Sequence, residues 1–278
     1  MEKKKQKKPY FLIVMWSIIA LLAVSGITYA WFNFSSSTNV TPDTGSTISN
    51  GEASLLISTS QGGPFDKTVN LVLGSHSEAL RPVSTYDLNG FYTSAAQNAN
   101  GITILYQDVT NEVDAHTMRG TLYLKAEGGD LDVYFMKPML DFGSNVQALA
   151  SLRLGLKITG SANDGSYIFR LDDMMDVSGA ASRETITNPG STVSSISGGS
   201  PNYVSDPARN INEFCAQVNS PEDTDPQAGP NALMTLTDGQ IAEVNYRLYL
   251  EGCDNNCINE VQVKEVALSL GFAGVPRG

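Results

Sequence analysis

The sequence predicts an all-β protein: a jelly-roll-like β-sandwich, preceded by a hydrophobic N-terminal helix and an extended arm. Short apolar runs recur along most of the chain, and turns rich in Gly, Asn and Asp separate them. No long 3.6-residue apolar period follows Ala30. Many short strands spaced in this way favour one sandwich over residues 52–278. Two smaller sandwiches split by a linker are the alternative.

The predicted strands follow from local alternation of polar and apolar residues. Segments 120–126 and 131–137 flank the turn EGGD, which predicts a hairpin. Segment 241–252 alternates with an expected bulge near Ile241, and one helical turn is expected at 145–150. The expected strands are 54–58, 69–73, 102–109, 120–126, 131–137, 151–160, 166–171, 241–252 and 261–272.

A long polar stretch, residues 177–230, interrupts this pattern. It is rich in Gly, Ser and Pro, and loops of that size are uncommon inside compact domains. We therefore expect a loop insertion at one end of the sandwich, tied down in part by Phe214 and Cys215.

The N-terminus has the organisation of a secretory signal peptide. A basic segment, 1–10, precedes the apolar run 11–24, and the small residues of SGITYA end at Ala30. Cleavage after Ala30 would leave Trp31 as the new N-terminus. The alternative is an uncleaved membrane anchor, because no charged residue occurs between Phe11 and Phe34. Both interpretations export the remainder of the chain.

The charge balance argues against nucleic-acid binding. The chain has 18 basic and 29 acidic residues and a formal charge of −11. Removal of residues 1–30 takes away five lysines and Glu2, which leaves a net charge of −15. Such an acidic body repels phosphate backbones.

Three cysteines, Cys215, Cys253 and Cys257, are candidates for one disulfide in an exported protein. A Cys215–Cys257 bridge would staple the long loop to the turn after the strand at 241–252. A Cys253–Cys257 bridge would instead pinch that turn. The sequence leaves both pairings open.

The sequence offers no catalytic constellation, so we expect a protein that is not an enzyme and that has no cofactor or metal site. It contains neither an H-E-x-x-H motif nor a G-x-S-x-G motif. His76 and His116 are interpreted as surface loop residues. The acidic clusters 171–176 and 221–225 lack the spacing of a calcium loop and are interpreted as solvated loops.

Three stretches together resemble a known family. They are GITYAWFNFSSSTNV at the signal junction, QALASLRLGLKI (147–158), and YRLYLEGCDNNCIN (246–259) before an apolar final strand. The chain resembles the TasA/camelysin-type biofilm matrix proteins of Gram-positive bacteria, in particular the BsaA-like branch. The junction resembles substrates of the specialised signal peptidase SipW.

The resemblance implies a secreted jelly-roll subunit that polymerises with copies of itself into extracellular matrix fibres. The arm, residues 31–51, would act as a donor strand that fills a gap in the sheet of the next subunit. Partners would be other copies, other matrix components and, during export, the signal peptidase. The alternative is a membrane-anchored cell-surface adhesin. The anchoring side chains of the arm would be Trp31, Phe32, Phe34, Val40 and Ile48.

Overall fold

We describe the protein from a computed structural model of residues 1–278. The residues that the structure describes are 44–49, 53–71, 81–97, 104–141, 146–171, 191–218, 225–254, 257 and 268–277. Their strands are β1 (Thr44–Ser49), β2 (Ser54–Ser58), β3 (Thr68–Asn70), β4 (Tyr92–Gln97), β5 (Ile104–Asp108), β6 (Met118–Glu127), β7 (Leu131–Phe135), β8 (Leu152–Thr159), β9 (Gly165–Arg170), β10 (Ser191–Ser197), β11 (Ser200–Ser205), β12 (Arg209–Asn210), β13 (Met234–Leu236), β14 (Ile241–Leu250) and β15 (Ser269–Pro276). Their helices are η1 (Thr110–Ala115), η2 (Lys137–Met139), α2 (Val146–Ser151) and η5 (Ile211–Phe214).

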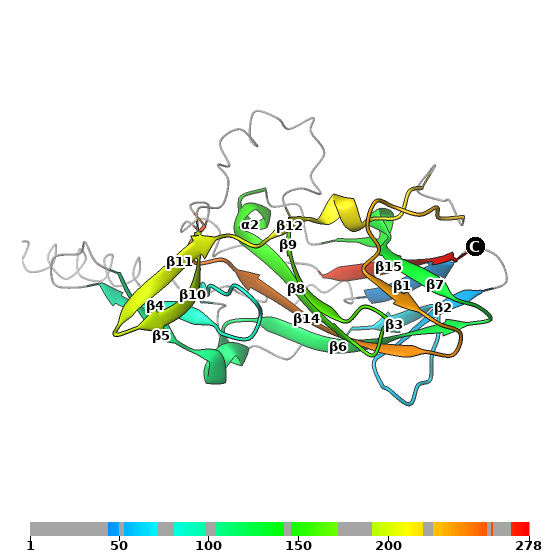
Figure 1. The fold of residues 1–278 in the computed structure, drawn as a ribbon, viewed down its shortest axis with the longest axis horizontal. Coiled ribbons are helices and arrows are strands. Elements are labelled where there is room, and N and C mark those ends of the chain that lie inside the picture. The colour runs from blue at the N-terminus through cyan, green and yellow to red at the C-terminus, as the bar shows by residue number, and fades with distance from the viewer. Residues whose placement is uncertain are drawn as a thin grey trace, which may run out of the picture.

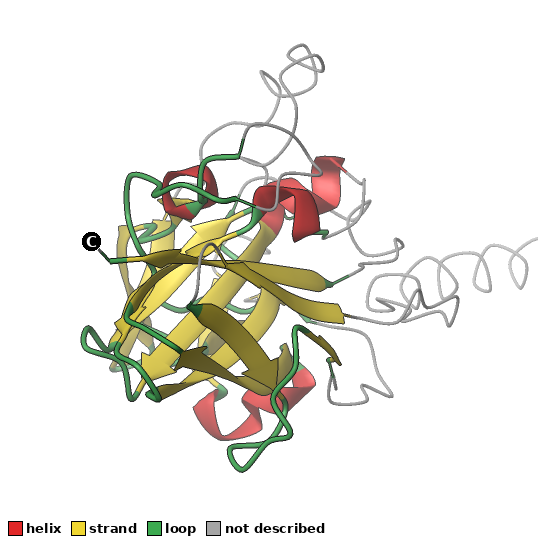
Figure 2. Cartoon of the chain, turned by 90° about the vertical axis from the view of Figure 1, so that its right-hand side faces the viewer, coloured by secondary structure: helices red, strands yellow, loops and turns green. Residues whose placement is uncertain are grey.

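Two sheets form the body of the molecule, and the all-β prediction is confirmed (Figures 1 and 2). A five-stranded sheet has the order β13-β7-β15-β1-β3, and a six-stranded sheet has the order β12-β9-β8-β14-β6-β2. Two hairpins, β4–β5 and β10–β11, make separate two-stranded sheets. Helix α2 lies where the helical turn was predicted.

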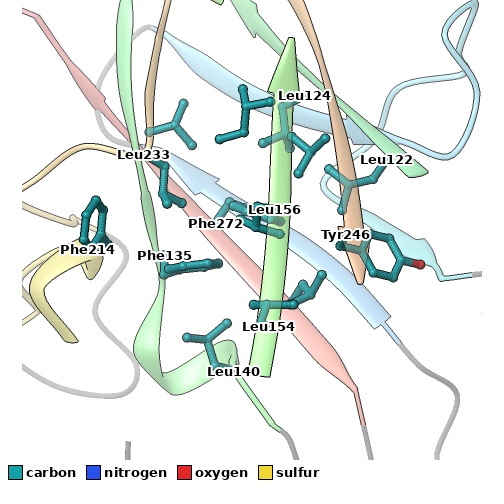
Figure 3. Packing of buried hydrophobic residues seen from close by; sticks show 14 of the residues in the cluster. Leu122, Leu124, Phe135, Leu140, Leu154, Leu156, Phe214, Leu233, Tyr246 and Phe272 are labelled. Carbon is teal, nitrogen blue, oxygen red and sulfur yellow. The ribbon is translucent and has the colours of Figure 1, made fainter. Parts of the chain in front are cut away.

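One apolar core lies between the two large sheets (Figure 3). Leu154 and Leu156 of β8 face Phe135 of β7 and Phe272 of β15 across it. The rings of Phe135 and Phe272 stack with centroids 5.7 Å apart, and Phe169 of β9 meets Phe135 edge-on at 5.3 Å. The alternation predicted for β8 therefore gives the observed inward face.

Strand β14 is regular, which corrects the expected bulge. Its pairing with β6 and β8 runs without a register shift. The buried face begins at Ala242 and continues through Val244 and Tyr246, whereas Ile241 is only half-buried. Because Ala242 is small, its place in the inward series was not recognised from the sequence.

Strands β6 and β7 are not the predicted hairpin. They are consecutive in the chain, but β6 pairs with β14 and β2, whereas β7 pairs with β15 and β13. Gly128, at φ +88°, begins the turn that carries the chain from one sheet to the other. Turn residues alone do not distinguish a hairpin from a crossing between sheets, because both need a sharp reversal.

A second apolar cluster covers the outer face of the six-stranded sheet. Segment 83–91 contributes Phe91, whose ring meets Tyr249 of β14 edge-on at 6.3 Å, and segment 109–113 contributes Val109 and Val113. Gly155 of β8 permits this layer to approach, because a Cβ there would lie 2.5 Å from Leu88 Cδ2. The six-stranded sheet is thus buried on both faces in this region.

The long polar stretch contains regular structure rather than a plain loop. Within residues 177–230 the structure describes 191–218 and 225–230, which contain hairpin β10–β11, β12 and η5. Phe214 is buried in the main core and meets Phe169 at 5.2 Å, so the expected anchoring by Phe214 is confirmed. Strand β10 was not predicted because its sequence, STVSSIS, is rich in serine and Val193 is its one fully buried apolar residue.

The predicted signal peptide, residues 1–30, lies outside the described residues. Within the described ranges, no helix has the length and apolarity needed to cross a membrane.

We expect Phe272→Ala to lower the free energy of unfolding by about 3–5 kcal/mol, because it leaves a cavity beside Phe135 at the centre of the core. Urea denaturation followed by intrinsic fluorescence measures the change. Tyr86→Ala is the matched control, because Tyr86 is 48% exposed and its loss should change stability by less than about 0.5 kcal/mol. Equal effects of the two substitutions would contradict the core assignment.

Candidate assembly interface

The last part of the predicted arm is a strand inside the five-stranded sheet. Strand β1 runs parallel to β15, from Thr44 opposite Ser269 to Ser49 opposite Gly274. Its other edge pairs antiparallel with β3 over Thr44–Ser46. In Figure 1, β1 (blue) lies beside β15 (red), the last strand of the chain. The two ends of the described chain therefore meet in one sheet.

The sequence of β1, TGSTIS, explains how this strand is held. Five of its six residues are Ser, Thr or Gly, and the sixth, Ile48, is its single large aliphatic residue. Such a sequence offers little apolar surface for burial, and its backbone pairs with β15 on one edge and with β3 on the other. Main-chain pairing thus holds strand β1 on both edges.

Thr47 is the exception, because it is only 5% exposed and its side chain makes a buried hydrogen bond. Its hydroxyl donates a hydrogen bond to Leu55 O of β2 at 2.7 Å and lies 3.3 Å from Lys67 O. Its backbone N–H donates to Lys67 O at 2.8 Å. Since β2 belongs to the six-stranded sheet, Thr47 connects the two sheets at this corner.

Strand β15 lies close to both sheets at its glycines. A Cβ on Gly274 would lie 2.9 Å from Leu55 Cβ and 3.0 Å from Leu131 Cδ1. A Cβ on Gly271 would collide with Met139 of η2. The glycines therefore let β15 present a straight backbone edge to β1 in a crowded position.

The structure revises the interpretation of the arm. We expected residues 31–51 to be satisfied only by a neighbouring subunit, but Thr44–Ser49 already pairs within its own chain. Ile48 lies in β1, opposite Ala273. The other anchoring residues and the cleavage site lie outside the described residues: Ala30, Trp31, Phe32, Phe34 and Val40.

The three cysteines are free thiols in the structure, and neither candidate disulfide is formed. Cys215 is buried in the main core, and burial raises the pKa of its thiol to about 11. Cys253 is half-buried, and its Sγ lies 3.4 Å from the hydroxyl of Tyr106. Cys257 is half-buried against the main core, where burial raises its pKa to about 12.

His116 is not the surface residue that we expected. It is 4% exposed, and its Nδ1 lies 3.4 Å from Arg81 O. Burial lowers the pKa of its imidazole, which favours the neutral form. The burial arises because η1 folds the segment 109–117 against the outer apolar cluster. His76 lies outside the described residues.

Sequence reasoning missed a buried charge cluster of Arg153, Asp206, Asp254 and Glu251. Arg153 of β8 is fully buried, and it forms ion pairs with Asp206 at 2.9 Å and with Asp254 at 2.6 Å. Its Nη1 donates to Ala150 O at 2.9 Å. The alternation of β8 places Arg153 on the face opposite the core leucines, and the sequence gives no signal that this face is covered. In the structure, other segments cover that outer face.

Glu251 lies at the junction of this charge cluster with hairpin β10–β11. Its Oε1 accepts from the backbone N–H of Cys253 at 3.1 Å, and its Oε2 lies 3.4 Å from Thr192 Oγ1 of β10. Burial raises the pKa of Glu251 to about 8, although contacts with Ser84 and Arg153 act in the opposite direction. Within the described residues, no group of His, Cys, Asp and Glu is arranged to hold a metal ion. We interpret the cluster as a structural junction.

We expect Glu251 to make stability fall as the pH rises. Its pKa is raised in the folded state, so the folded protein holds the proton more tightly than the unfolded chain, and this contribution is lost between about pH 4.5 and pH 8. Glu251→Gln mimics the protonated acid and should raise the unfolding free energy at pH 9 by roughly 2–5 kcal/mol relative to the native chain, with little change at pH 4. Thermal unfolding at several pH values measures this difference.

Asp254→Asn is the contrasting variant for this experiment. It removes a charge that pairs with the buried Arg153, so it should destabilise the protein by about 3 kcal/mol at pH 9, where Glu251→Gln stabilises it. A Glu251→Gln effect that is the same at pH 4 and pH 9 would contradict the assignment.

No protein-family model, no curated protein and no solved structure matches this chain. The interpretation of the β1 interface therefore depends on the residues and contacts of this chain alone.

Proposed function

We propose that the protein is an exported structural subunit of an extracellular matrix fibre, and that it assembles by exchanging β1 between neighbouring subunits. In this proposal residues 1–30 are a signal peptide with a hydrophobic helix, cleaved after Ala30, and the body is a jelly roll without catalytic activity. The resemblance of the sequence to TasA/camelysin-type proteins supports this function.

The jelly-roll assignment is supported by the path of the chain. From β1 to β3 and from β6 to β8, consecutive strands alternate between the five-stranded and the six-stranded sheet. The same alternation returns from β12 through β13 and β14 to β15. Chains that cross between two sheets at most connections are typical of jelly rolls, whereas sequential hairpins favour meanders.

The observation that carries the proposal is the position of β1. It is the first described strand, it lies between β15 and β3, and its backbone pairs with both of them. An identical segment from another copy would make the same hydrogen bonds in the same place. Exchange of an identical element between protomers is a low-cost route to association.

Exchange of this kind gives an open-ended assembly. The donating segment lies at the N-terminal end of the body, and the accepting edge belongs to β15 near the C-terminus. Each subunit can therefore donate to one neighbour and accept from another. Such a heterologous contact extends into a filament unless the geometry happens to close a ring.

Exchange is tested by mixing two single variants, Thr44→Cys and Ser269→Cys, whose positions face each other across β1 and β15. Neighbouring strands lie about 4.8 Å apart, which is within the range of Cα separations that a disulfide spans. We expect oxidised glutathione to join the two different molecules into a covalent dimer on a non-reducing gel. The same samples should contain fibres by electron microscopy.

The off-register control pairs Thr44→Cys with Glu112→Cys in η1, and we expect no comparable dimer. The double variant Thr44→Cys/Ser269→Cys reports pairing within one molecule. Cross-links that form only inside the double variant, with no dimer from the mixture, would refute exchange between subunits.

Mass spectrometry of the exported protein tests the processing step. We expect the chain to begin at Trp31, because the small residues before it fit the site of a signal peptidase. Retention of residues 11–30 on the cell-associated protein would instead favour the membrane-anchored adhesin.

A further inference from the structure

We propose that the slot between β15 and β3 selects the strand that fills it through a hydroxyl group at the position of Thr47, and that the strand it selects in the assembled state is Thr44–Ser49 of a second copy. This inference rests on the proposed exchange of β1. It adds the chemical feature that the slot recognises.

The slot contains one acceptor, Leu55 O, that a side-chain donor at position 47 satisfies. The Thr47 hydroxyl donates to Leu55 O at 2.7 Å in a buried position and lies 3.3 Å from Lys67 O. Lys67 O also accepts from the backbone N–H of Thr47, which any residue other than proline supplies. Leu55 O is therefore the acceptor that depends on the side chain.

The direction of Leu55 O follows from the pairing of β2. Ile57, two residues further along β2, exchanges backbone hydrogen bonds with Asp66 at 2.7 and 3.0 Å. Residues two apart in a strand point their backbone groups to the same side, so Leu55 O faces the same way. Strand β6 lies on the opposite edge of β2. Thr47 thus caps a carbonyl of β2 that β6 does not reach.

An apolar side chain at position 47 would leave that carbonyl buried without its donor. A buried acceptor that loses its partner is destabilising, because it has already lost its hydrogen bonds to water. A long polar side chain is also disfavoured, because position 47 is 5% exposed and lies opposite the buried Phe272. Small hydroxyl residues meet both conditions.

The segment Thr44–Ser49 carries this hydroxyl in the register that the slot accepts. A second copy of the chain therefore offers a strand that matches the slot in backbone, size and hydroxyl position. This match distinguishes a second copy from an extended peptide of unrelated sequence, which would share only the backbone hydrogen bonds.

Competition between donor chains tests the selection. Two donors are synthetic peptides of residues 40–52 that carry Thr44→Cys, and one of them also carries Thr47→Val, which keeps the shape of threonine but removes the hydroxyl. A peptide has no slot of its own, so the loss of the hydroxyl is not offset within the donor. Both peptides are mixed in equal amounts with the full-length Ser269→Cys acceptor, and mass spectrometry counts the two cross-linked products. We expect the donor with Thr47 to be favoured by on the order of tenfold, which corresponds to about 1.4 kcal/mol.

Two further donors serve as controls. Thr47→Ser keeps the hydroxyl and should compete within about threefold of the native donor, and Ser49→Ala changes a half-buried hydroxyl elsewhere on β1 and should compete equally well. Hydrogen exchange of the β15 amides gives a second measurement, made on full-length chains that carry each substitution at position 47 and no introduced cysteine. There, Thr47→Val should raise the exchange rate by on the order of tenfold, and Thr47→Ser should leave it nearly unchanged.

The outcomes separate this inference from the proposed function. Equal competition by the native and Thr47→Val donors, with cross-linking intact, would overturn the hydroxyl selection alone. Absence of any dimer from the mixed full-length Thr44→Cys and Ser269→Cys chains would overturn exchange itself, and with it the second copy as occupant. Faster hydrogen exchange of the β15 amides in Thr47→Ser than in Thr47→Val would also contradict the inference, because the shape of the side chain, and not its hydrogen bond, would then determine how well the strand is held.

Discussion

The backbone edge of β15 is the constraint on which this fold depends. Strand β15 lies in the middle of its sheet, and its glycines bring it close to η2, β2 and β7. A strand in that position needs a partner on each side, because buried N–H and C=O groups without hydrogen bonds are strongly unfavourable. Strand β7 supplies one partner and β1 supplies the other. The protein thus needs a strand beside β15, and the N-terminal end of the described chain provides it.

The β1 interface and the apolar core are stabilised by different interactions. Phe135, Phe169 and Phe272 pack between the sheets, so that region depends on burial of apolar surface. Strand β1 depends on main-chain hydrogen bonds and on the Thr47 hydroxyl, which retain their strength whichever molecule supplies the strand. Exchange between identical segments therefore changes little in contact energy. In the proposed assembly, the balance between monomer and fibre is then set by the protein concentration and by the entropy of the connection that leads to β2.

Sequence reasoning identified the strands with strong alternation and missed the features that depend on what covers a surface. Leu152, Leu154 and Leu156 indicated the inward face of β8, and the structure confirms it. The same pattern puts Arg153 on the opposite face of β8, but it gives no sign of the burial of Arg153, because alternation assigns a face and does not show that another layer covers it. The polar segment of β1 was interpreted as an arm for the same reason: its stability comes from β15, more than 200 residues away in the sequence, and no local pattern records that pairing.

The remaining edges of the two large sheets offer little for uncontrolled association. Among the described strands, the five-stranded sheet ends in β13 and β3, each of three residues, and one edge of the six-stranded sheet is the two-residue β12. The other edge, β2, is covered by Asp66, which pairs with Ile57, and by the Thr47 hydroxyl on Leu55 O. Short or covered edges disfavour the addition of foreign strands. In the proposed assembly, association through the two large sheets is therefore directed to the β1 position, where the occupant already belongs to this sequence, and the short or covered edges of the described strands disfavour competing aggregation.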